Sequence, residues 1–292
     1  MSNSSKKITL LFSAIALIGV VIYFYFKDYI PKYNWSENYI NTNEQPYGLK
    51  LIFNLLSKTH SKTDFIIINK PPKEALNKSD SSSLYILIGG NFFIDSLSSI
   101  ALIDFVKRGN NAFISSIEST HLLFRVLTNA ERPTLYYTNF EDSVIDVKFD
   151  SIHNNASYKF EYKFYKKLAK YKWAGVDSIM FADTLSKYRY ERVTTIHNYY
   201  VDCFRVKCGK GWFIFHFNPL FLTNYNLSGK DGFNYVNSLF SDYNKKTIYW
   251  DEFSKTATRD DYQNPGHESP LRFILSQRSL KWAWYLICIL VS

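Results

Sequence analysis

Cysteine, glycine and proline are scarce in this chain, whose 292 residues include 3 Cys, 11 Gly and 8 Pro. Three cysteines are too few for a disulfide framework. Cys203 and Cys208 stand close together in the sequence, but on an extended strand their separation of about 16 Å would exceed the reach of a disulfide. We therefore predict that both cysteines are packing residues.

The glycines do not form a phosphate-binding loop. Such a loop needs Gly-Lys-Ser/Thr to open a helix, whereas Gly209 and Gly211 in "CGKGWFIFHF" lead into Trp212 and a run of aromatic residues. A nucleophile elbow is also missing, because Cys208 does not stand between close glycines on a strand-to-helix turn. The stretch predicts two strands around a glycine-containing turn.

Metal-ligand and acid/base patterns are lacking as well. His216, His267 and Glu268 do not have the spacing of a metal-ligand set. Asp251 and Glu252 end a predicted strand, where α/β sheets commonly hold their sites. Adjacent side chains on an extended strand point to opposite faces, however, which makes these two a poor acid/base pair. We predict no catalytic residue, no metal and no cofactor.

The positive charge does not mark a nucleic-acid surface. The net charge is +9, but Lys and Arg are scattered along the chain, as on a solvated surface. In "YKFEYKF" the rings from Tyr158 to Phe164 alternate with charged residues and fall on one face of a strand. A nucleic-acid platform needs its rings beside its cations. We predict no nucleic-acid partner, and attraction to anionic lipid headgroups is a lesser alternative.

Two apolar segments predict membrane spans. Residues 8–26 form an uncharged run whose helix would rise about 28 Å, which matches a bilayer core. We interpret it as an uncleaved anchor after a tail at 1–7, with a cleaved signal peptide as the alternative. Residues 280–292 predict the start of a second transmembrane helix, cut short, or else a short core helix. The predicted location is the cytoplasmic (inner) membrane, with the soluble domain extracytoplasmic.

Between these segments the pattern is that of an α/β fold. After a connector at 27–45, the continuous apolar runs "DFIIIN", "LYILIGG" and "NAFISSI" predict buried strands. Amphipathic helices lie between them, one of which is capped by Asp95 or Ser96 and stopped by Gly109. We predict a mostly parallel, doubly wound sheet, amidotransferase/flavodoxin-like, over 46–132 and 196–278. Short alternating runs over 133–195 predict a β-rich insertion, and the whole domain would be flanked by transmembrane helices.

Several stretches together carry a family resemblance. In order, they are "EQPYGLKLIFNLL", "LYILIGG", "VKRGNNAFIS", "GKGWFIFHFNPLFLTNYNL", "IYWDEF" and "SPLRFILSQRSLKWAWYLI". The chain resembles the bacterial membrane-protein family catalogued as domain of unknown function 4350. That resemblance implies a class I glutamine amidotransferase-like fold. It also implies a membrane-protein complex linked to an AAA-type ATPase and von Willebrand A-like proteins.

The resemblance does not carry a catalytic site. An amidotransferase needs a Cys in a glycine-flanked elbow after a central strand, whereas "NAFISSI" runs into Glu118, Ser119 and Thr120. No catalytic residue carries over, since the nucleophile and its partners are missing. The chain is therefore expected to be a non-enzymatic binding or scaffold protein of a bacterial envelope assembly.

The expected ligand site is the carboxyl edge of the sheet together with the "NPLFLTN" loop. The residues predicted to bind are Gly89, Gly90, Asn218, Pro219, Thr223, Asn224, Asp251 and Glu252. One alternative is a degenerate amidotransferase-like hydrolase that uses Ser115, Ser116 or Ser119, which requires a histidine in hydrogen-bond reach and free backbone N–H groups. Another is an envelope-polysaccharide binder, which requires an exposed row of aromatic rings.

Overall fold

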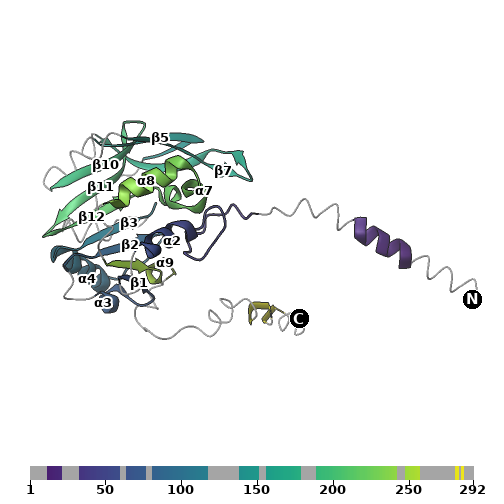
Figure 1. Ribbon diagram of the computed structural model, residues 1–292, viewed down its shortest axis with the longest axis horizontal. Coiled ribbons are helices and arrows are strands. Elements are labelled where there is room, and N and C mark those ends of the chain that lie inside the picture. The colour runs from purple at the N-terminus through teal and green to yellow at the C-terminus, as the bar shows by residue number, and fades with distance from the viewer. Residues whose placement is uncertain are drawn as a thin grey trace, which may run out of the picture.

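A large mixed sheet, with helices on both of its faces, forms the body of the protein (Figure 1). The computed structural model describes residues 12–21, 33–59, 64–76, 81–117, 138–150, 156–178, 189–241, 247–256, 280–282 and 284–285. The strands of the longest path, in spatial order, are β1 (Phe65–Ile68), β13 (Ile248–Asp251), β2 (Leu84–Ile88), β3 (Asn111–Ser115), β12 (Gly211–His216), β11 (Tyr200–Cys208), β10 (Tyr190–Ile196), β5 (Val144–Phe149) and β6 (Ser157–Glu161).

One half of the sheet is parallel. The strands β1, β13, β2, β3 and β12 all run in the same direction. Every residue of β2 and of β3 is buried, as the continuous apolar runs predict for strands that are covered on both faces. The carboxyl ends of these strands meet at one edge, where Ser115 and His216 are partners in register.

The other half is antiparallel, which corrects the predicted fold. The chain turns from Cys208 to Gly211, so that β11 pairs antiparallel with β12, and hydrogen bonding continues through β10 and β5 to β6. β9 (Tyr171–Asp177) pairs with β11 and with β4 (Thr138–Asp142). The prediction of a mostly parallel, doubly wound, amidotransferase/flavodoxin-like sheet is therefore wrong. The fold is a mixed, sheet-rich α/β fold, because β4, β5, β6, β9 and β10 join the same sheet as the parallel half.

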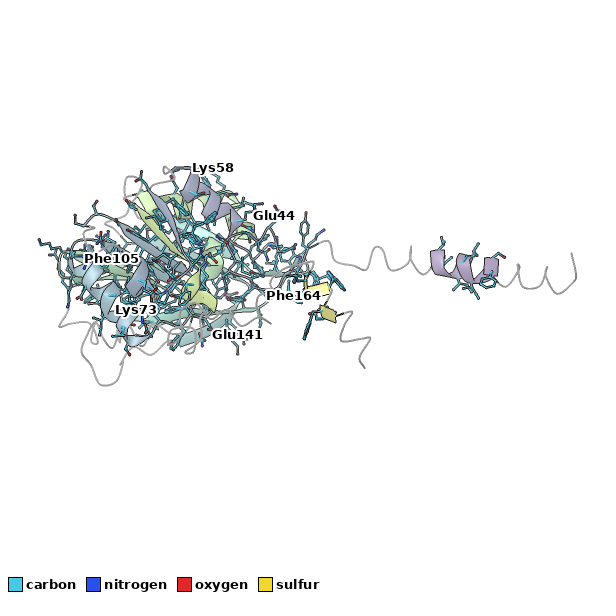
Figure 2. All side chains as sticks on the ribbon, turned by 90° about the horizontal axis from the view of Figure 1, so that it is seen from below. Glu44, Lys58, Lys73, Phe105, Glu141 and Phe164 are labelled. Atoms are coloured by element: carbon cyan, nitrogen blue, oxygen red, sulfur yellow. The ribbon has the colours of Figure 1, made fainter. Side chains whose placement is uncertain are left out.

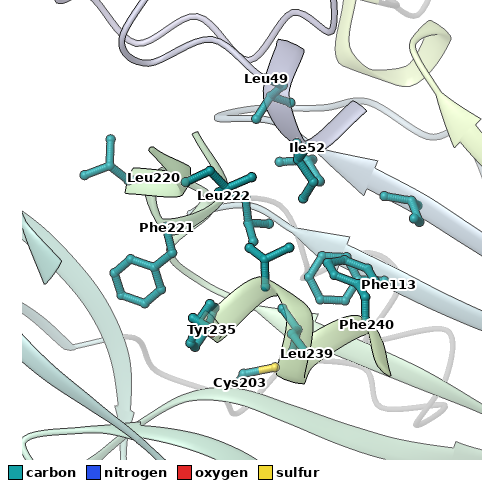
Figure 3. Packing of buried hydrophobic residues seen from close by; sticks show 14 of the residues in the cluster. Leu49, Ile52, Phe113, Cys203, Leu220, Phe221, Leu222, Tyr235, Leu239 and Phe240 are labelled. Atoms are coloured by element: carbon teal, nitrogen blue, oxygen red, sulfur yellow. The ribbon is translucent and has the colours of Figure 1, made fainter. Parts of the chain in front are cut away.

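Two hydrophobic clusters lie on opposite faces of the sheet. On one face pack α2 (Lys50–Lys58), the 3-10 helix η2 (Pro219–Leu222), α7 (Asn224–Leu227) and α8 (Lys230–Phe240). Figure 3 shows Tyr235, Leu239 and Phe240 of α8 gathered with Phe113 and Cys203 of the strands. On the other face lie α3 (Pro72–Ala75) and α4 (Ser96–Lys107), and α9 (Phe253–Thr256) follows β13.

The predicted boundaries of α4 are confirmed. The Asp95 carboxylate accepts a hydrogen bond from Ser98 N at 2.8 Å, which satisfies one of the unpaired amides of the first turn. At the other end Gly109 takes a positive φ of 122°, in the left-handed region that glycine enters without steric cost. The helix therefore begins and ends where its capping residues predict.

The membrane predictions are corrected by the helices that the structure describes. None of the described helices is long and apolar enough to cross a membrane. Residues 12–21 are helical. The rest of 8–26 and most of 280–292 lie outside the described residues. This finding overturns the predicted transmembrane flanks and, with them, the predicted location in the inner membrane.

Candidate functional site

A chain of buried polar side chains begins at the carboxyl edge of the parallel strands. Ser115 ends β3 and His216 ends β12, and Ser115 Oγ lies 2.6 Å from His216 Nδ1. The other ring nitrogen, Nε2, lies 3.1 Å from the hydroxyl of Tyr235 and 4.0 Å from Asp202 Oδ2. Thr194 donates a hydrogen bond of 2.7 Å to the second carboxyl oxygen of Asp202. A serine, a histidine and an aspartate from three strands are thus brought together.

Burial sets the protonation of this chain. The side chains of His216 and Asp202 have no exposed surface. Desolvation disfavours charge, so it raises the pKa of Asp202 to about 7 and lowers the pKa of His216 to about 3. Below neutral pH the carboxyl therefore holds a proton and the imidazole is neutral, which is the reverse of their ordinary behaviour in water.

The geometry meets one requirement of the hydrolase alternative and misses the others. Ser115 has a histidine within hydrogen-bond reach, but both side chains are fully buried, so no substrate carbonyl can reach the hydroxyl. The neighbouring backbone donors are also occupied, since Gly89 N donates to Ser115 O and Ser116 N donates to His216 O, each at 3.0 Å. Ser116 Oγ donates to Gly90 O at 2.7 Å, and Ser119 lies outside the described residues. In this conformation the arrangement holds the sheet edge together, and these two described backbone donors cannot serve an oxyanion hole.

The second polar group at this edge surrounds Asp251. Its buried carboxylate accepts hydrogen bonds from the hydroxyl of Tyr85 and from both the backbone N and the Oγ of Ser254. Desolvation raises the pKa of Asp251. Glu252 instead pairs with Lys255 Nζ at 2.7 Å. Asp251 therefore anchors α9 to the sheet, and the two adjacent acids have different partners, as the strand geometry predicts.

The segment 33–48 covers the sheet edge beside Gly89 and Gly90. Gly89 is buried, and a Cβ added at Gly90 would lie 3.3 Å from the ring of Tyr39. Lys255 Nζ donates to Tyr39 O at 3.1 Å, which fixes this segment over the edge. The aromatic ring of Tyr39 thus occupies the space beside Gly90, whereas Gly89 faces Asn91 O and the side chain of Lys255.

The first residues of the "NPLFLTN" loop are structural anchors. The Asn218 amide pairs with both backbone groups of Ala174, accepting from N at 2.9 Å and donating to O at 2.8 Å. Pro219 is buried and begins η2. Thr223 Oγ1 donates to Leu220 O at 2.7 Å. The buried polar groups of Asn218 and Thr223 therefore bind the protein's own backbone.

Asn224 ties three segments together. Its Oδ1 accepts from Leu51 N, and its Nδ2 donates to the backbone oxygens of Asn43 and Gln45, each at 2.8 Å. Its backbone N also donates to Gly48 O at 2.8 Å. One buried side chain therefore fixes the start of α2 and the loop before it against α7.

A pocket of about 620 Å³ opens beside Asn224, between the segment 33–48, α2, α7 and the turn that contains Lys166. Its wall includes the rings of Tyr33, Trp35 and Tyr225, and Trp35 meets Tyr225 edge to face with their centroids 5.5 Å apart. The ion pair of Lys50 with Glu44 adds charge of both signs to this wall. Of the eight residues predicted to bind a ligand, all of them described, Asn224 is the one that lines this pocket.

Sequence reasoning missed the role of residues 33–45, which were assigned to a connector. Trp35 is 7% exposed and Tyr39 is 9% exposed, and both belong to the hydrophobic core. A Cβ at Gly48 would lie 2.3 Å from Asn43 O, so that the tight loop requires glycine there. Aromatic residues within a polar stretch, followed by "PYG", were the signal that could have identified a packed loop.

No family model and no curated protein matches this chain. Within the described ranges, no three His, Cys, Asp or Glu side chains gather into a possible metal site. His267 and Glu268 lie outside those ranges. Function is therefore inferred from the geometry of the chain itself.

Proposed function

We propose that this chain is a non-enzymatic binding protein that holds a short segment of a partner polypeptide in the pocket beside Asn224. The proposal rests on a difference in solvent access between the pocket and the buried pair Ser115 and His216. The pocket is open and has a volume of about 620 Å³, within the usual range of ligand sites. The serine and histidine that could do chemistry, Ser115 and His216, have no exposed surface.

The wall of the pocket suits a polypeptide. Tyr33 is 38% exposed and Leu51 is 43% exposed, so the pocket presents apolar surface to solvent that a bound chain would cover. Lys50 and Glu44 bring a cation and a carboxylate to the same wall, where the polar groups of a peptide can pair with them. The partners that the family resemblance implies, an AAA-type ATPase and von Willebrand A-like proteins, are polypeptides and remain predictions.

A polysaccharide ligand is less well supported. Stacking on sugar rings requires exposed aromatic faces in a row, but Trp35 is 7% exposed and its ring already contacts Tyr47 and Tyr225 edge to face. Tyr225 is half-buried, and its hydroxyl donates to Glu161. Among the three rings of the described pocket wall, Tyr33 is therefore the exposed one.

The proposal is tested by selecting peptides from a displayed random library on the purified protein. The dissociation constant of a selected peptide is then measured by fluorescence anisotropy for the wild type and for Leu51→Asp, which puts a charge into the pocket wall. Leu97→Asp is the matched control, because Leu97 is a leucine of α4 that is 61% exposed on the other face. We expect Leu51→Asp to weaken binding at least tenfold, about 1.4 kcal/mol, and Leu97→Asp to leave it unchanged. The absence of selected peptides, or equal effects of the two variants, would contradict the proposal.

A further inference from the structure

A short hairpin with a two-residue turn lies at the rim of this pocket. β7 (Lys163–Phe164) and β8 (Lys167–Leu168) pair antiparallel, and Lys166 of the turn between them lines the pocket. The base of the hairpin is held by Tyr47, whose hydroxyl accepts from Lys163 N at 2.9 Å and donates to Lys163 O at 2.6 Å. Figure 2 shows Phe164 at the end of the domain that lies away from Phe105. The hairpin therefore has a fixed base and a projecting tip.

The turn holds large side chains in an unfavourable backbone conformation. Tyr165 has a φ of 48° and Lys166 a φ of 66°, both in the left-handed region. Hairpins of this length use Asn-Gly or similar pairs at such positions, because a Cβ is disfavoured there. A turn alone needs neither a tyrosine nor a lysine. Strained residues of this kind gather at sites where their side chains have a function.

The hairpin exposes three large apolar side chains. Phe164 is 46% exposed, Tyr165 is 52% exposed and Leu168 is 54% exposed. The rings of Phe164 and Tyr165 meet edge to face, with their centroids 4.4 Å apart. Phe164 and Tyr165 form an exposed apolar patch, whereas Leu168, which pairs with Lys163, lies on the other face of the hairpin. Exposed apolar patches mark interaction surfaces.

The same tip is positively charged. Lys166, Lys167 and Lys170 are exposed, and none of them forms an ion pair with a residue that the structure describes. The nearest carboxylate in the sequence, Glu161, is already paired with Lys163 Nζ at 2.5 Å and accepts from Tyr225. The cations of the tip are therefore available to a partner of opposite charge.

We propose that the β7–β8 hairpin recognises an acidic segment of the partner polypeptide. Apolar side chains of that segment pack on Phe164 and Tyr165, and its carboxylates face Lys166 and Lys167. This inference rests on the proposed function, because Lys166 belongs to both surfaces and one segment can cross the hairpin and enter the pocket. Charge complementarity of this kind selects the partner and speeds its association.

A nucleic acid suits the surface less well than an acidic polypeptide. Phe164 lies opposite Lys167 in the hairpin, which puts a ring beside a cation. However, the pocket beside Lys166 presents the exposed aliphatic side chain of Leu51, on which no base stacks and on which an apolar side chain of a polypeptide can pack. A polypeptide that mixes acidic and apolar residues satisfies every part of this surface.

The test uses two fluorescein-labelled synthetic peptides and the purified full chain. One peptide alternates glutamate with leucine and phenylalanine, and the other has lysine in place of each glutamate. Anisotropy titrations are run at low and at physiological ionic strength, with a labelled oligothymidylate as the nucleic-acid probe. We expect the acidic peptide to bind at least tenfold more tightly than the basic one, and to bind more weakly as salt increases.

Charge variants assign that binding to the hairpin. Lys166→Glu with Lys167→Glu should weaken binding of the acidic peptide at least tenfold. Lys58→Glu with Lys230→Glu is the matched control, because it changes the net charge equally at exposed lysines outside the hairpin. Equal effects of the two double variants, equal binding of the two peptides, or tighter binding of the oligothymidylate would each overturn the inference.

A turn variant separates recognition from folding. Tyr165→Asn with Lys166→Gly places in the turn the residues that its backbone favours. We expect this variant to melt no lower than the wild type and yet to bind the acidic peptide at least tenfold more weakly. Unchanged binding would overturn the inference. If the selected library peptides lose binding in Leu51→Asp but are not acidic, the inference about the hairpin is wrong, while the proposed function stands.

Discussion

Asp202 Oδ2 lies 4.0 Å from His216 Nε2, and neither side chain has any exposed surface. Burial raises the pKa of Asp202 from its ordinary 3.8 to about 7, and lowers the pKa of His216 from 6.5 to about 3. Between about pH 4 and 6.5 the unfolded chain carries the proton on the imidazole, whereas the folded protein carries it on the carboxyl. The pair binds one proton in both states, so its two pH dependences cancel in that window.

Replacing one member of the pair should reveal the pH dependence of the other. In Asp202→Asn the lowered pKa of His216 remains. Its stabilising contribution is present above about pH 6.5 and is lost as the pH falls toward about 3, so stability should rise with pH. The slope relative to wild type should approach about 1.4 kcal/mol per pH unit, measured by urea unfolding at several pH values.

His216→Gln should give the opposite slope. The raised pKa of Asp202 then acts alone, and its contribution is present below about pH 4 and is lost as the pH rises through about 7. Stability relative to wild type should fall with pH across this window. Parallel pH profiles for both variants and the wild type would contradict the assigned protonation of this pair.

Asn224→Ala should destabilise the fold through the loop that it holds. The substitution leaves Leu51 N and the backbone oxygens of Asn43 and Gln45 without the amide that binds each at 2.8 Å. We expect a loss of about 2–4 kcal/mol in the free energy of unfolding, because buried polar groups lose their partners. Asn54→Ala, on α2 in the same pocket wall, is the control and should change stability by no more than about 0.5 kcal/mol. Similar losses in both variants would count against the anchoring role.

Gly48→Ala should be strongly destabilising. The added Cβ would lie 2.3 Å from Asn43 O, so that the loop before α2 would have to move. We expect a loss of at least about 2 kcal/mol, measured by chemical unfolding. Gly229→Ala is the matched control, since its Cβ would lie 3.4 Å from Asn226 O with φ at −89°. A tolerated Gly48→Ala would mean that the loop is not packed as described.

A fluorophosphonate probe should not label Ser115 in the native protein. Its hydroxyl is buried and lies 2.6 Å from His216 Nδ1 without access for a substrate. The measurement is mass spectrometry of the modified peptides after incubation under native conditions, with Ser115→Ala as the control. Labelling that Ser115→Ala abolishes would restore the hydrolase alternative.

The parallel half of the sheet could be predicted from local pattern. The run "LYILI" has apolar residues on both faces, so it had to lie where both sides of a strand are covered. The helix cap at Asp95 could also be predicted from nearby residues, because its carboxylate accepts from the backbone amide three residues ahead. In contrast, the alternating runs from Thr138 onward indicated one-sided burial and nothing about their neighbours.

The predicted site residues stay a prediction, and there is a physical reason why local pattern could not decide them. Polar residues at strand ends are the signal of a ligand site, and they are equally the signal of a backbone that must satisfy its own hydrogen bonds. Asn218, Thr223 and Asp251 belong to the second kind. The pocket forms because Trp35 and the loop after it fold back onto α7. The spacing of residues in the sequence does not predict this long-range contact.

The sequence by itself determined the buried strands, the caps and the absence of glycine-rich and metal-binding motifs, since these depend on residues within a few positions of one another. Only the tertiary structure decided that the sheet continues antiparallel through β11 and β10, that Ser115 meets His216 across two strands, and that Asn224 closes a pocket with residues far earlier in the chain. These relationships depend on which surfaces pack together. Packing is a property of the whole chain, because the pairing of each strand depends on the apolar area that the complete fold buries.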